Sequence, residues 1–521
     1  MTVGSGADPR VALQRGSVPG WLPIAAIAVL AVALRLVPTL RGGGLFGRFS
    51  YDGSVYYTAA AGLAHGLLPY RDFLLLHPPG ILLALFPFAL LGRLAGDPVG
   101  LASARVAWVL VGAANAVLVQ RILRPLGVRA ALLGGIGYAV FYPAVFIDRA
   151  TILEPVAASC LLGAMLLTSR PTIDRVRADR AALLAGVLLG LSSGIKIWGV
   201  VFVLAFVGWY VAGRQIRRAA MLLAGSAIGV SLVCLPFFLA APAAMWRMVV
   251  VDQLGRRESA LGLGHRIFDL TGLAPLSTTA SAHPWLVVVA GAVVVAAVLL
   301  ALPSRIGRLA VLVLAVSWVL LLTTPSWFVH YGGLAAAPTL VVLGSAAAQL
   351  EHLWHDRRAA GRWRRARLIP AAATVIIVVA LLGYAVPILT STVGAPFPGR
   401  QLAAQLAAVD GCVTTDEPTV LIESNVLQRN FARKCPLVAD LGGYSYDLPT
   451  ARSVPREQNA RWQQLALGYL RSGTATILVR FHVGSGFDVV SANTVRHWPV
   501  LARIDGYVVR EPRPAIAASP R

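Results

Sequence analysis

The chain has 521 residues, of which 57% are hydrophobic and 13% are charged, and its mean hydropathy is +0.71. Because about a quarter of the residues in soluble domains are charged, this composition excludes a wholly soluble protein and predicts an α-helical polytopic membrane protein. The net charge of +23 does not indicate a nucleic-acid partner, since the arginines gather in short loops between apolar runs, as in the cytoplasmic loops of membrane proteins.

The first apolar run, residues 21–39, is long enough to cross the ~30 Å hydrocarbon core of a bilayer. No clear small-residue cleavage site follows it, so we expect a retained anchor. If every Arg-rich loop is cytoplasmic, successive spans must alternate in direction. Only one of the next two apolar runs can then cross the membrane. We assign the crossing to 101–120. We expect the shorter run 81–95, which Pro78-Pro79-Gly80 precedes, to lie on the outer surface or to enter and return.

The same alternation assigns the later spans. The run 181–213 begins and ends beside Arg-rich loops and is predicted to form a hairpin whose outer turn is Ser193–Lys196. The remaining spans are 128–146, 154–169, 219–241, 285–303, 309–324, 332–350 and 370–390. The sequence therefore predicts about eleven transmembrane helices within residues 1–391, with a cytoplasmic N-terminus and a first outer loop over residues 41–100.

The last part of the chain, residues 392–521, has the composition of a soluble domain, and we expect a small extracellular α/β domain there. The segment 457–470 has helical periodicity. Three short runs resemble strands, namely 419–423, 476–481 and 507–510. The tail Glu511–Arg521 is rich in Pro and Ala and is predicted to be disordered.

The four cysteines form two groups. Cys160 and Cys234 lie in apolar spans and are interpreted as packing residues. Cys412 and Cys435 lie in the polar C-terminal region, where a disulfide is expected if that region is extracellular. Two free thiols are the alternative.

The predicted topology brings five separate polar clusters to the outer face, and we expect them to line one cavity. They are Asp52 with Tyr56, Tyr70, Arg71, Asp72 and His77; Asp148 with Arg149 and Glu154; Lys196; Gln253 with Arg256 and Arg257 in the segment 252–258; and Trp327 with His330 and Tyr331. Cations could hold a phosphate, and a carboxylate could accept the proton of an attacking hydroxyl. Aromatic rings could stack on a sugar. This mixture of groups suits a phosphorylated lipid substrate.

Each cluster also has a structural interpretation. Asp52 or Glu154 could cap or begin a helix, and Lys196 could reach toward the membrane surface on a hairpin tip. The adjacent Arg71 and Asp72 could brace their loop, as His77 could. The last cluster could form an interfacial aromatic belt.

Several motifs of soluble enzymes are missing from the sequence. It contains no G-x-x-x-x-G-K-[ST] phosphate-binding loop, no H-E-x-x-H or paired C-x-x-C zinc pattern and no G-x-S-x-G elbow. A D-x-D motif of the kind that binds metal and nucleotide sugar is also absent. A sugar carried on a lipid phosphate is therefore a more natural substrate than a cytosolic nucleotide sugar.

The stretch that begins with Asp52 and continues as VYYTAAAGLAHGLLPYRDF and HPPG resembles the first extracytoplasmic loop of the GT-C superfamily. More narrowly, it is similar to bacterial membrane glycosyltransferases of the protein mannosyltransferase and aminoarabinose transferase type. The later segments DRATILEP, GIKIWG, DQLGRRES and HYGGLAAAP look like those of actinobacterial members. The resemblance covers roughly residues 20–350.

The resemblance implies a polyprenyl-phosphate sugar donor, transfer at the outer membrane face and inversion at the anomeric carbon. It implies that Asp52 is the catalytic base and that Asp148 or Glu154 is the second acidic residue. The donor phosphate would then contact Lys196, Arg256 and His330, residues that match the family's binding positions. Some relatives carry an Asp-Glu pair in the first loop, whereas here Gly53 follows Asp52, so we expect neither a metal nor another cofactor.

The predicted protein is thus an inverting glycosyltransferase of the plasma membrane. It would move a mannose- or arabinose-like sugar from a polyprenyl phosphate to a cell-envelope glycan, lipid or protein. One alternative is a transporter or lipid flippase, for which repeated halves and broken helices near mid-membrane would be expected. A second is a scaffold whose outer domain binds a cell-wall partner, which would be favoured if the Asp52 and Lys196 clusters lay more than about 15 Å apart, beyond contact with one reacting centre.

Overall fold

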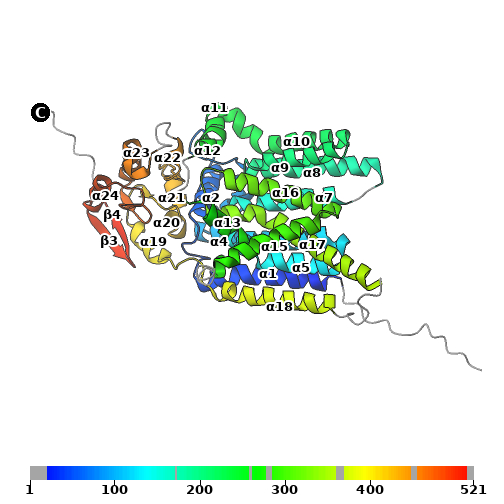
Figure 1. Ribbon diagram of the computed structural model, residues 1–521. Coiled ribbons are helices and arrows are strands. Elements are labelled where there is room, and N and C mark those ends of the chain that lie inside the picture. Colours follow the sequence, from blue (N-terminus) through cyan, green and yellow to red (C-terminus); the bar gives the residue numbers. More distant parts are fainter. Residues whose placement is uncertain are drawn as a thin grey trace, which may run out of the picture.

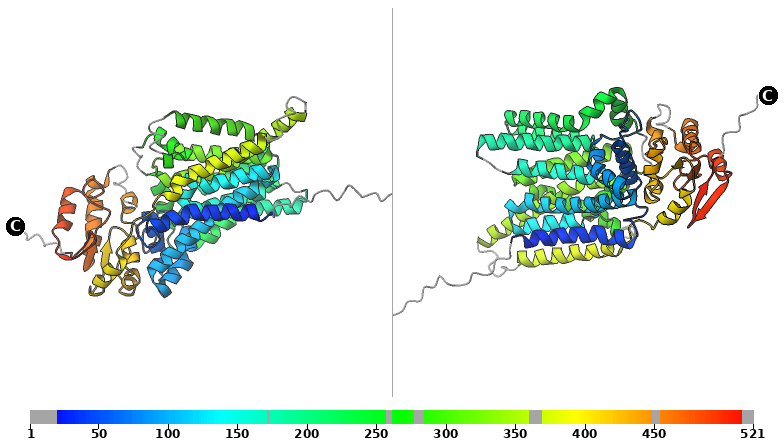
Figure 2. Two further views of the ribbon diagram at one scale, coloured as in Figure 1. Left: turned by 90° about the horizontal axis from the view of Figure 1, so that it is seen from below. Right: turned by 180° about the vertical axis from the view of Figure 1, so that it is seen from behind.

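A computed structural model describes residues 20–170, 173–256, 261–276, 284–359, 369–447 and 454–512. It has a bundle of long, roughly parallel helices and a smaller C-terminal part that lies at one end of the bundle (Figure 1). The two further views show the same arrangement (Figure 2). Arg257, which belongs to one of the predicted polar clusters, lies outside the described residues. So does nearly all of the tail that is predicted to be disordered.

The bundle is built from helices that coincide with the predicted spans. They are α1 (Leu22–Arg41), α4 (Asp97–Leu123), α5 (Val128–Val140), α6 (Tyr142–Asp148), α7 (Leu153–Ser169), α8 (Arg175–Ile195), α9 (Gly199–Ala212), α10 (Ile216–Ala240), α15 (Trp285–Ala301), α16 (Arg305–Thr323), α17 (Gly333–Ala359) and α18 (Ile369–Thr390). In the described part of the chain, seven helices are long and apolar enough to cross a membrane, and the bent pair α5–α6 makes eight. The helices α7, α9 and α15 are apolar but shorter. The polytopic helical fold is confirmed, and the total of eleven spans stays a prediction.

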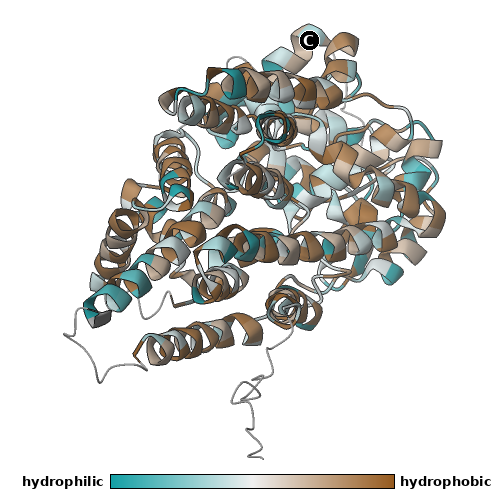
Figure 3. Ribbon diagram, turned by 90° about the vertical axis from the view of Figure 1, so that its right-hand side faces the viewer, coloured by the Kyte–Doolittle hydropathy of each residue, from teal (hydrophilic) through white to brown (hydrophobic). Residues whose placement is uncertain are grey.

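Apolar side chains on the outside of the bundle face away from the protein. Val375, Ile376 and Val379 of α18 are exposed, as are Val288 and Leu299 of α15. Viewed along the helices, the outer ribbons are largely hydrophobic (Figure 3). An exposed apolar surface of this extent fits contact with lipid.

The predicted single span 128–146 is bent. Its two helices α5 and α6 meet at an angle of 56°. Phe141 between them is extended, with φ −62° and ψ 116°, and Pro143 lies in the first turn of α6. Proline lacks an N–H group and clashes with a preceding helical turn, and this favours a break of the helix at this position.

The predicted hairpin 181–213 corresponds to α8 and α9. Small residues let α8 pack directly on α10: a Cβ atom at Gly186 would lie 2.1 Å from the carbonyl oxygen of Leu222, and one at Gly225 would lie 2.0 Å from that of Leu183. Such close packing of backbones is typical of small residues spaced four apart in membrane helices. It fixes the position of the end of α8, where Lys196 follows.

Short elements connect the bundle to its C-terminal neighbour. The helix α2 (Tyr51–Ala64) lies between the two parts (Figure 1). The helix α3 (Gly80–Ala95) packs on α2 and α4. The other short elements are α11 (Pro242–Trp246), η3 (Arg247–Val251), α12 (Asp252–Leu254), α13 (Leu263–Thr271) and η5 (Val329–Gly332).

The C-terminal part contains a four-stranded sheet in the order β1-β2-β4-β3. β1 (Val413–Thr415) pairs in parallel with β2 (Ala475–Ile477), and the pairs of β4 (Tyr507–Arg510) with β2 and with β3 (Val500–Ile504) are antiparallel. The helices around it are α19 (Gly399–Ala407), α20 (Thr419–Glu423), α21 (Leu427–Ala432), α22 (Tyr444–Asp447), α23 (Ala460–Arg471) and α24 (Val489–Arg496).

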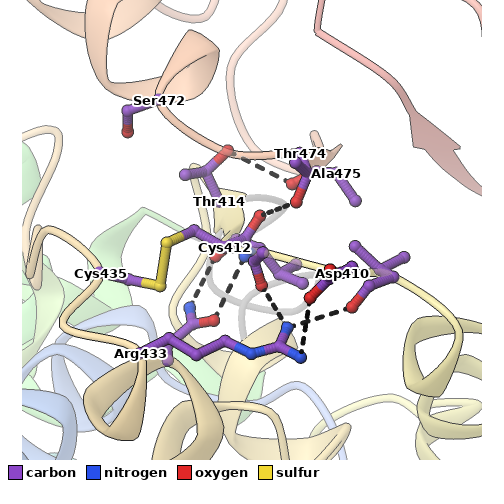
Figure 4. Close-up of a disulfide and its surroundings, with 12 residues drawn as sticks. Asp410, Cys412, Thr414, Arg433, Cys435, Ser472, Thr474 and Ala475 are labelled. Atoms are coloured by element: carbon purple, nitrogen blue, oxygen red, sulfur yellow. Dashed lines mark hydrogen bonds and ion pairs between the residues drawn. A yellow bond between two sulfur atoms is a disulfide. The ribbon is translucent and has the colours of Figure 1, made fainter.

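Two of the predicted C-terminal elements change. The run 419–423 is the helix α20 and not a strand, since Pro418 precedes it and a short apolar run does not distinguish helix from strand. Only the first residues of 476–481 belong to a strand, because the backbone N–H groups of the later ones bind Asp416. The strand at 507–510 and the helix at 457–470 are confirmed, and Cys412 and Cys435 form a disulfide (Figure 4).

Buried contacts fix the C-terminal part on the bundle. Arg105 of α4 forms a buried ion pair with Glu423, with Nη1 3.1 Å from Oε1. Gln428 donates a hydrogen bond of 2.7 Å to the carboxylate of Asp97. One hydrophobic cluster also continues through both parts. The cavity described next is formed where they meet.

Candidate active site

A cavity of about 160 Å³ lies between the bundle and the C-terminal part. Its polar and aromatic lining residues come from segments far apart in the sequence: Tyr51, Asp52, Tyr56, His77, Lys196, Arg256, Phe328, His330, Tyr331, Asp440, Tyr446, Arg456 and Arg480. Four of the five predicted clusters thus meet at one place. The sequence did not predict that residues of the C-terminal part line this cavity.

Asp52 is the second residue of α2 and lines the cavity. The cap of this helix is Ser50, whose Oγ accepts a hydrogen bond from the N–H of Gly53 at 3.2 Å. The capping role considered for Asp52 is therefore filled by another residue. Among the described residues no cation forms an ion pair with its carboxylate, and burial raises the pKa of Asp52. A carboxylate that holds a proton more strongly than usual, and that faces a cavity, is suited to act as a general base.

The neighbouring Gly53 is closely packed. A Cβ atom at this position would lie 2.6 Å from Oγ1 of Thr151. Thr151 would therefore have to shift before any larger side chain could follow Asp52 directly.

Lys196 follows α8 and points into the cavity from the side of the bundle. Its Nζ lies 2.5 Å from Oε1 of Glu154, and both side chains are almost fully buried. The ammonium also lies 4.0 Å from the ring centre of Trp198 and 4.3 Å from that of Tyr331. Lys196 is thus held in place by a carboxylate and two aromatic faces, and it does not extend to the membrane surface.

Glu154 lies behind Lys196, in the first turn of α7. His330 contacts the same carboxylate, with Nε2 3.8 Å from Oε1. Glu154 itself is not a lining residue of the cavity. The geometry suits a carboxylate that orients Lys196 and His330.

Arg256 provides a second cation. Its Nη1 donates a hydrogen bond of 3.3 Å to the hydroxyl of Tyr331, and its guanidinium lies 4.9 Å from the ring centre of Tyr446.

His77 also lines the cavity. Its ring meets that of Tyr56 edge-on, with the ring centres 5.8 Å apart. Burial and the nearby Arg256 and Lys196 lower the pKa of His77 well below its usual value, so it is neutral at pH 7.

Four predicted site residues have structural contacts elsewhere. Arg71 forms an exposed ion pair with Asp72, with Nη2 2.9 Å from Oδ2. Gln253 donates a hydrogen bond to the carbonyl of Leu76. Neither Arg71 nor Gln253 lines the cavity.

The remaining two of the four lie within the bundle. Asp148 forms a fully buried ion pair with Arg35, with Oδ2 2.7 Å from Nη2. Arg149 donates a hydrogen bond of 3.0 Å to the carbonyl of Leu34. Both side chains therefore connect α1 to the end of α6 and do not reach the lining of the cavity.

The C-terminal part contributes groups that the sequence alone did not single out. The hydroxyl of Tyr51 donates a hydrogen bond of 2.8 Å to Asp440, and the guanidinium of Arg480 lies 3.8 Å from the ring centre of Tyr51. Asp416 fixes the loop of Arg480, since it accepts hydrogen bonds from the backbone N–H groups of residues 479–481. The only signal in the sequence was the concentration of Gly, Tyr and Asp in DLGGYSYD, residues 440–447.

No protein-family model matches the chain, and no curated protein matches it in sequence. Solved structures match it in fold. The structure of ArnT from Cupriavidus metallidurans bound to undecaprenyl phosphate has a TM-score of 0.58 and 14% sequence identity, over 97% of this chain and 100% of that chain. The structure of the same protein in the apo state gives a TM-score of 0.59 and 15% identity, over 96% and 98%. This chain has the GT-C fold.

A second match with the GT-C fold is the archaeal oligosaccharyltransferase AglB from Archaeoglobus fulgidus, in complex with an inhibitory peptide and a dolichol-phosphate. Its TM-score is 0.56 at 12% identity, over 88% of this chain and 69% of that chain. The predicted fold is confirmed. The match to ArnT also extends over nearly the whole chain, beyond the residues 20–350 that carried the resemblance in sequence.

Proposed function

We propose that the chain is an inverting membrane glycosyltransferase that uses a polyprenyl-phosphate sugar donor. The observation that carries the proposal is the arrangement of the cavity. The carboxylate of Asp52, which has no ion-pair partner in the described part of the chain, shares it with the cations Lys196 and Arg256. The GT-C structures that match the chain include one of ArnT bound to undecaprenyl phosphate.

The proposed reaction is a single displacement. Asp52 accepts the proton of the acceptor hydroxyl, whose oxygen attacks the anomeric carbon from the face opposite the phosphate. The bond between that carbon and the phosphate oxygen breaks, and its electron pair leaves with the lipid phosphate. Lys196 and Arg256 stabilise the negative charge of the leaving group, and because both are already held by aromatic neighbours, little reorganisation is needed.

We further propose that the cavity faces the extracytoplasmic side of the plasma membrane. The helix α8 supports this orientation, since it begins among arginines at Arg175 and ends next to Lys196 after 21 residues. That length corresponds to roughly 31 Å, about the thickness of the hydrocarbon core. If the Arg-rich end is cytoplasmic, the cavity and the C-terminal part lie outside.

The sugar and the acceptor complete the proposal. We propose a mannose- or arabinose-like sugar and a cell-envelope glycan, lipid or protein as its acceptor, without a divalent metal. The packing of Gly53 against Thr151 supports metal independence. A transfer rate that falls in EDTA and recovers with Mn²⁺ would contradict this part of the proposal.

The test uses the purified protein in lipid nanodiscs. Undecaprenyl-phosphate mannose and decaprenyl-phosphate arabinose are supplied in turn with cell-envelope acceptors, and released polyprenyl phosphate and glycosylated product are measured. Asp52→Asn is expected to lower transfer at least a hundredfold, whereas Asp72→Asn, which changes an exposed carboxylate of the same loop, keeps the wild-type rate. Equal transfer by wild type and Asp52→Asn would remove Asp52 as the base, and no transfer with either donor would contradict the proposed function.

A further inference from the structure

A second cavity, of about 460 Å³, lies within the C-terminal part. Its lining includes Tyr446, Arg456, Glu457, Arg480, Phe481 and Ser485. Tyr446, Arg456 and Arg480 also line the first cavity. The two cavities therefore share a wall, and a ligand in the second one lies next to the groups that surround Asp52.

The shared arginines are available to a ligand. Arg456 donates hydrogen bonds to Oγ of Ser445 at 3.3 Å and to the carbonyl oxygen of Gly442 at 3.2 Å, both of them uncharged acceptors. Arg480 is exposed and lies over the rings of Tyr51 and Phe481. Neither guanidinium forms an ion pair with any carboxylate in the described residues.

The rest of the lining suits a sugar chain. Tyr446 and Phe481 provide aromatic faces on which sugar rings stack. The carboxylate of Glu457 accepts a hydrogen bond of 2.7 Å from the N–H of Gly486 and can accept further ones from hydroxyl groups. Two unpaired guanidinium groups outweigh this one carboxylate, so the cavity as a whole favours an anion. Guanidinium groups bind carboxylate and phosphate with paired hydrogen bonds.

We infer that the second cavity is the acceptor site and that the acceptor is an anionic glycan, one that carries a carboxylate or phosphate group on a sugar. Arg456 and Arg480 hold the anionic group, and the rings of Tyr446 and Phe481 hold the sugars. The hydroxyl to be glycosylated then extends past the shared wall toward Asp52. This inference rests on the proposed transferase function, which it deepens by naming the acceptor class.

Asp416 has a positioning role in this site. It accepts three hydrogen bonds from backbone N–H groups at residues 479–481, at 2.8, 2.9 and 2.6 Å. These bonds set the conformation of the loop that carries Arg480. The side chain of Asp416 does not line either cavity.

The test measures binding, which does not depend on catalysis. The full-length protein in nanodiscs is titrated with an oligosaccharide that contains glucuronate, and in parallel with its neutral glucose counterpart. Wild type is expected to bind the glucuronate probe at least tenfold more tightly, and the difference is expected to shrink as salt is added, because surface charge interactions are screened. Equal affinity for the two probes, or binding of neither, would overturn the inference.

The variants Arg456→Gln and Arg480→Gln are each expected to weaken binding of the glucuronate probe at least tenfold and to leave binding of the neutral probe unchanged. The matched control is Arg461→Gln, which changes an exposed arginine of α23 that lines neither cavity. Wild-type affinity of both cavity variants for the glucuronate probe would overturn the inference, and thermal unfolding shows whether each variant is folded.

The two proposals fail separately. If the nanodisc protein transfers sugar with a requirement for Asp52 but does not distinguish the charged from the neutral probe, the acceptor class is wrong and the transferase function stands. If it binds the charged probe through the two arginines but transfers no sugar, the cavity is a glycan site on a protein that is not a transferase.

Discussion

The ammonium of Lys196 and the carboxylate of Glu154 lie 2.5 Å apart, with 4% and 0% of their side chains exposed. The pair joins the end of α8 to the start of α7 and presents its cation to the cavity. Only Lys196 lines that cavity, so the two residues have different functions. Glu154 keeps a buried cation in place, and Lys196 is the group that a donor phosphate would meet.

Glu154→Gln is expected to destabilise the protein and to reduce transfer together. Removing one partner of a buried ion pair leaves an uncompensated charge, which costs about 3–5 kcal/mol. The double variant Glu154→Gln, Lys196→Met removes both charges and is expected to recover most of the stability but no transfer. Thermal unfolding and donor turnover of the wild type and the two variants check this. If the double variant transferred sugar at the wild-type rate, Lys196 would not contact the leaving phosphate.

The acid limb of the pH–rate profile is expected to follow Asp52. Burial raises its pKa, and the base is active only when deprotonated, so transfer rises with pH and reaches half its maximum above the ordinary pKa of an aspartate. Asp440 contributes to the raised pKa and Arg480 opposes it. Asp440→Asn is therefore expected to shift the acid limb to lower pH and Arg480→Gln to shift it to higher pH. Shifts in the opposite directions would contradict the assignment of this limb to Asp52.

Stability is expected to depend on pH through Glu423, which fixes the C-terminal part on α4. Burial raises its pKa from 4.5 to about 7. The folded protein therefore binds a proton more tightly than the unfolded chain does, and this contribution to stability is fully present below pH 4.5 and lost as the pH rises through about 7. Comparing the melting temperatures of wild type and Glu423→Gln at pH 5 and pH 8 isolates the effect. Between pH 5 and pH 8, the melting temperature of the wild type is expected to fall more than that of the variant. An equal fall in both proteins would contradict this prediction.

The disulfide between Cys412 and Cys435 encloses a loop with a sequence separation of 23 residues. In the chain-entropy model, a crosslink over a loop of this length stabilises by roughly 3 kcal/mol. Cys412→Ser, Cys435→Ser is expected to lower the stability of the C-terminal part by about this amount, as measured by chemical unfolding. Reductant should destabilise the wild type to the same degree and leave the double variant unchanged. If reductant lowered the stability of the double variant as well, its effect would not come from the bond between Cys412 and Cys435.

Local sequence patterns predicted the parts of the fold that depend on local properties. An apolar run such as 370–390 predicts a helix by its length alone, and α18 spans Ile369–Thr390. Alternation of the spans predicted that Asp52, Lys196, Arg256 and His330 would meet, and they line one cavity. The prediction was wrong for 419–423, because a run of five buried residues is too short to show a periodicity that separates a strand from a helix.

Partners that are far apart in the sequence could not be predicted in this way. Asp148 was predicted to belong to one of the outer clusters that line the cavity, but its carboxylate pairs with Arg35, 113 residues away. Tyr51 hydrogen-bonds to Asp440 across 389 residues. Neither contact leaves a periodic or compositional signal, since each depends on how separate elements pack.

The sequence by itself determined that the chain is a helical membrane protein, where its long helices lie and which polar groups collect at one end of them. These properties follow from the cost of placing charges and unpaired backbone in hydrocarbon, which acts on each segment separately. Only the tertiary structure decided that Glu154 holds Lys196 from behind, and that Asp440, Arg456 and Arg480 complete the cavity. Those arrangements depend on the docking of the C-terminal part on the bundle, through a shared hydrophobic core and the buried pair Arg105–Glu423, and no single segment encodes that docking.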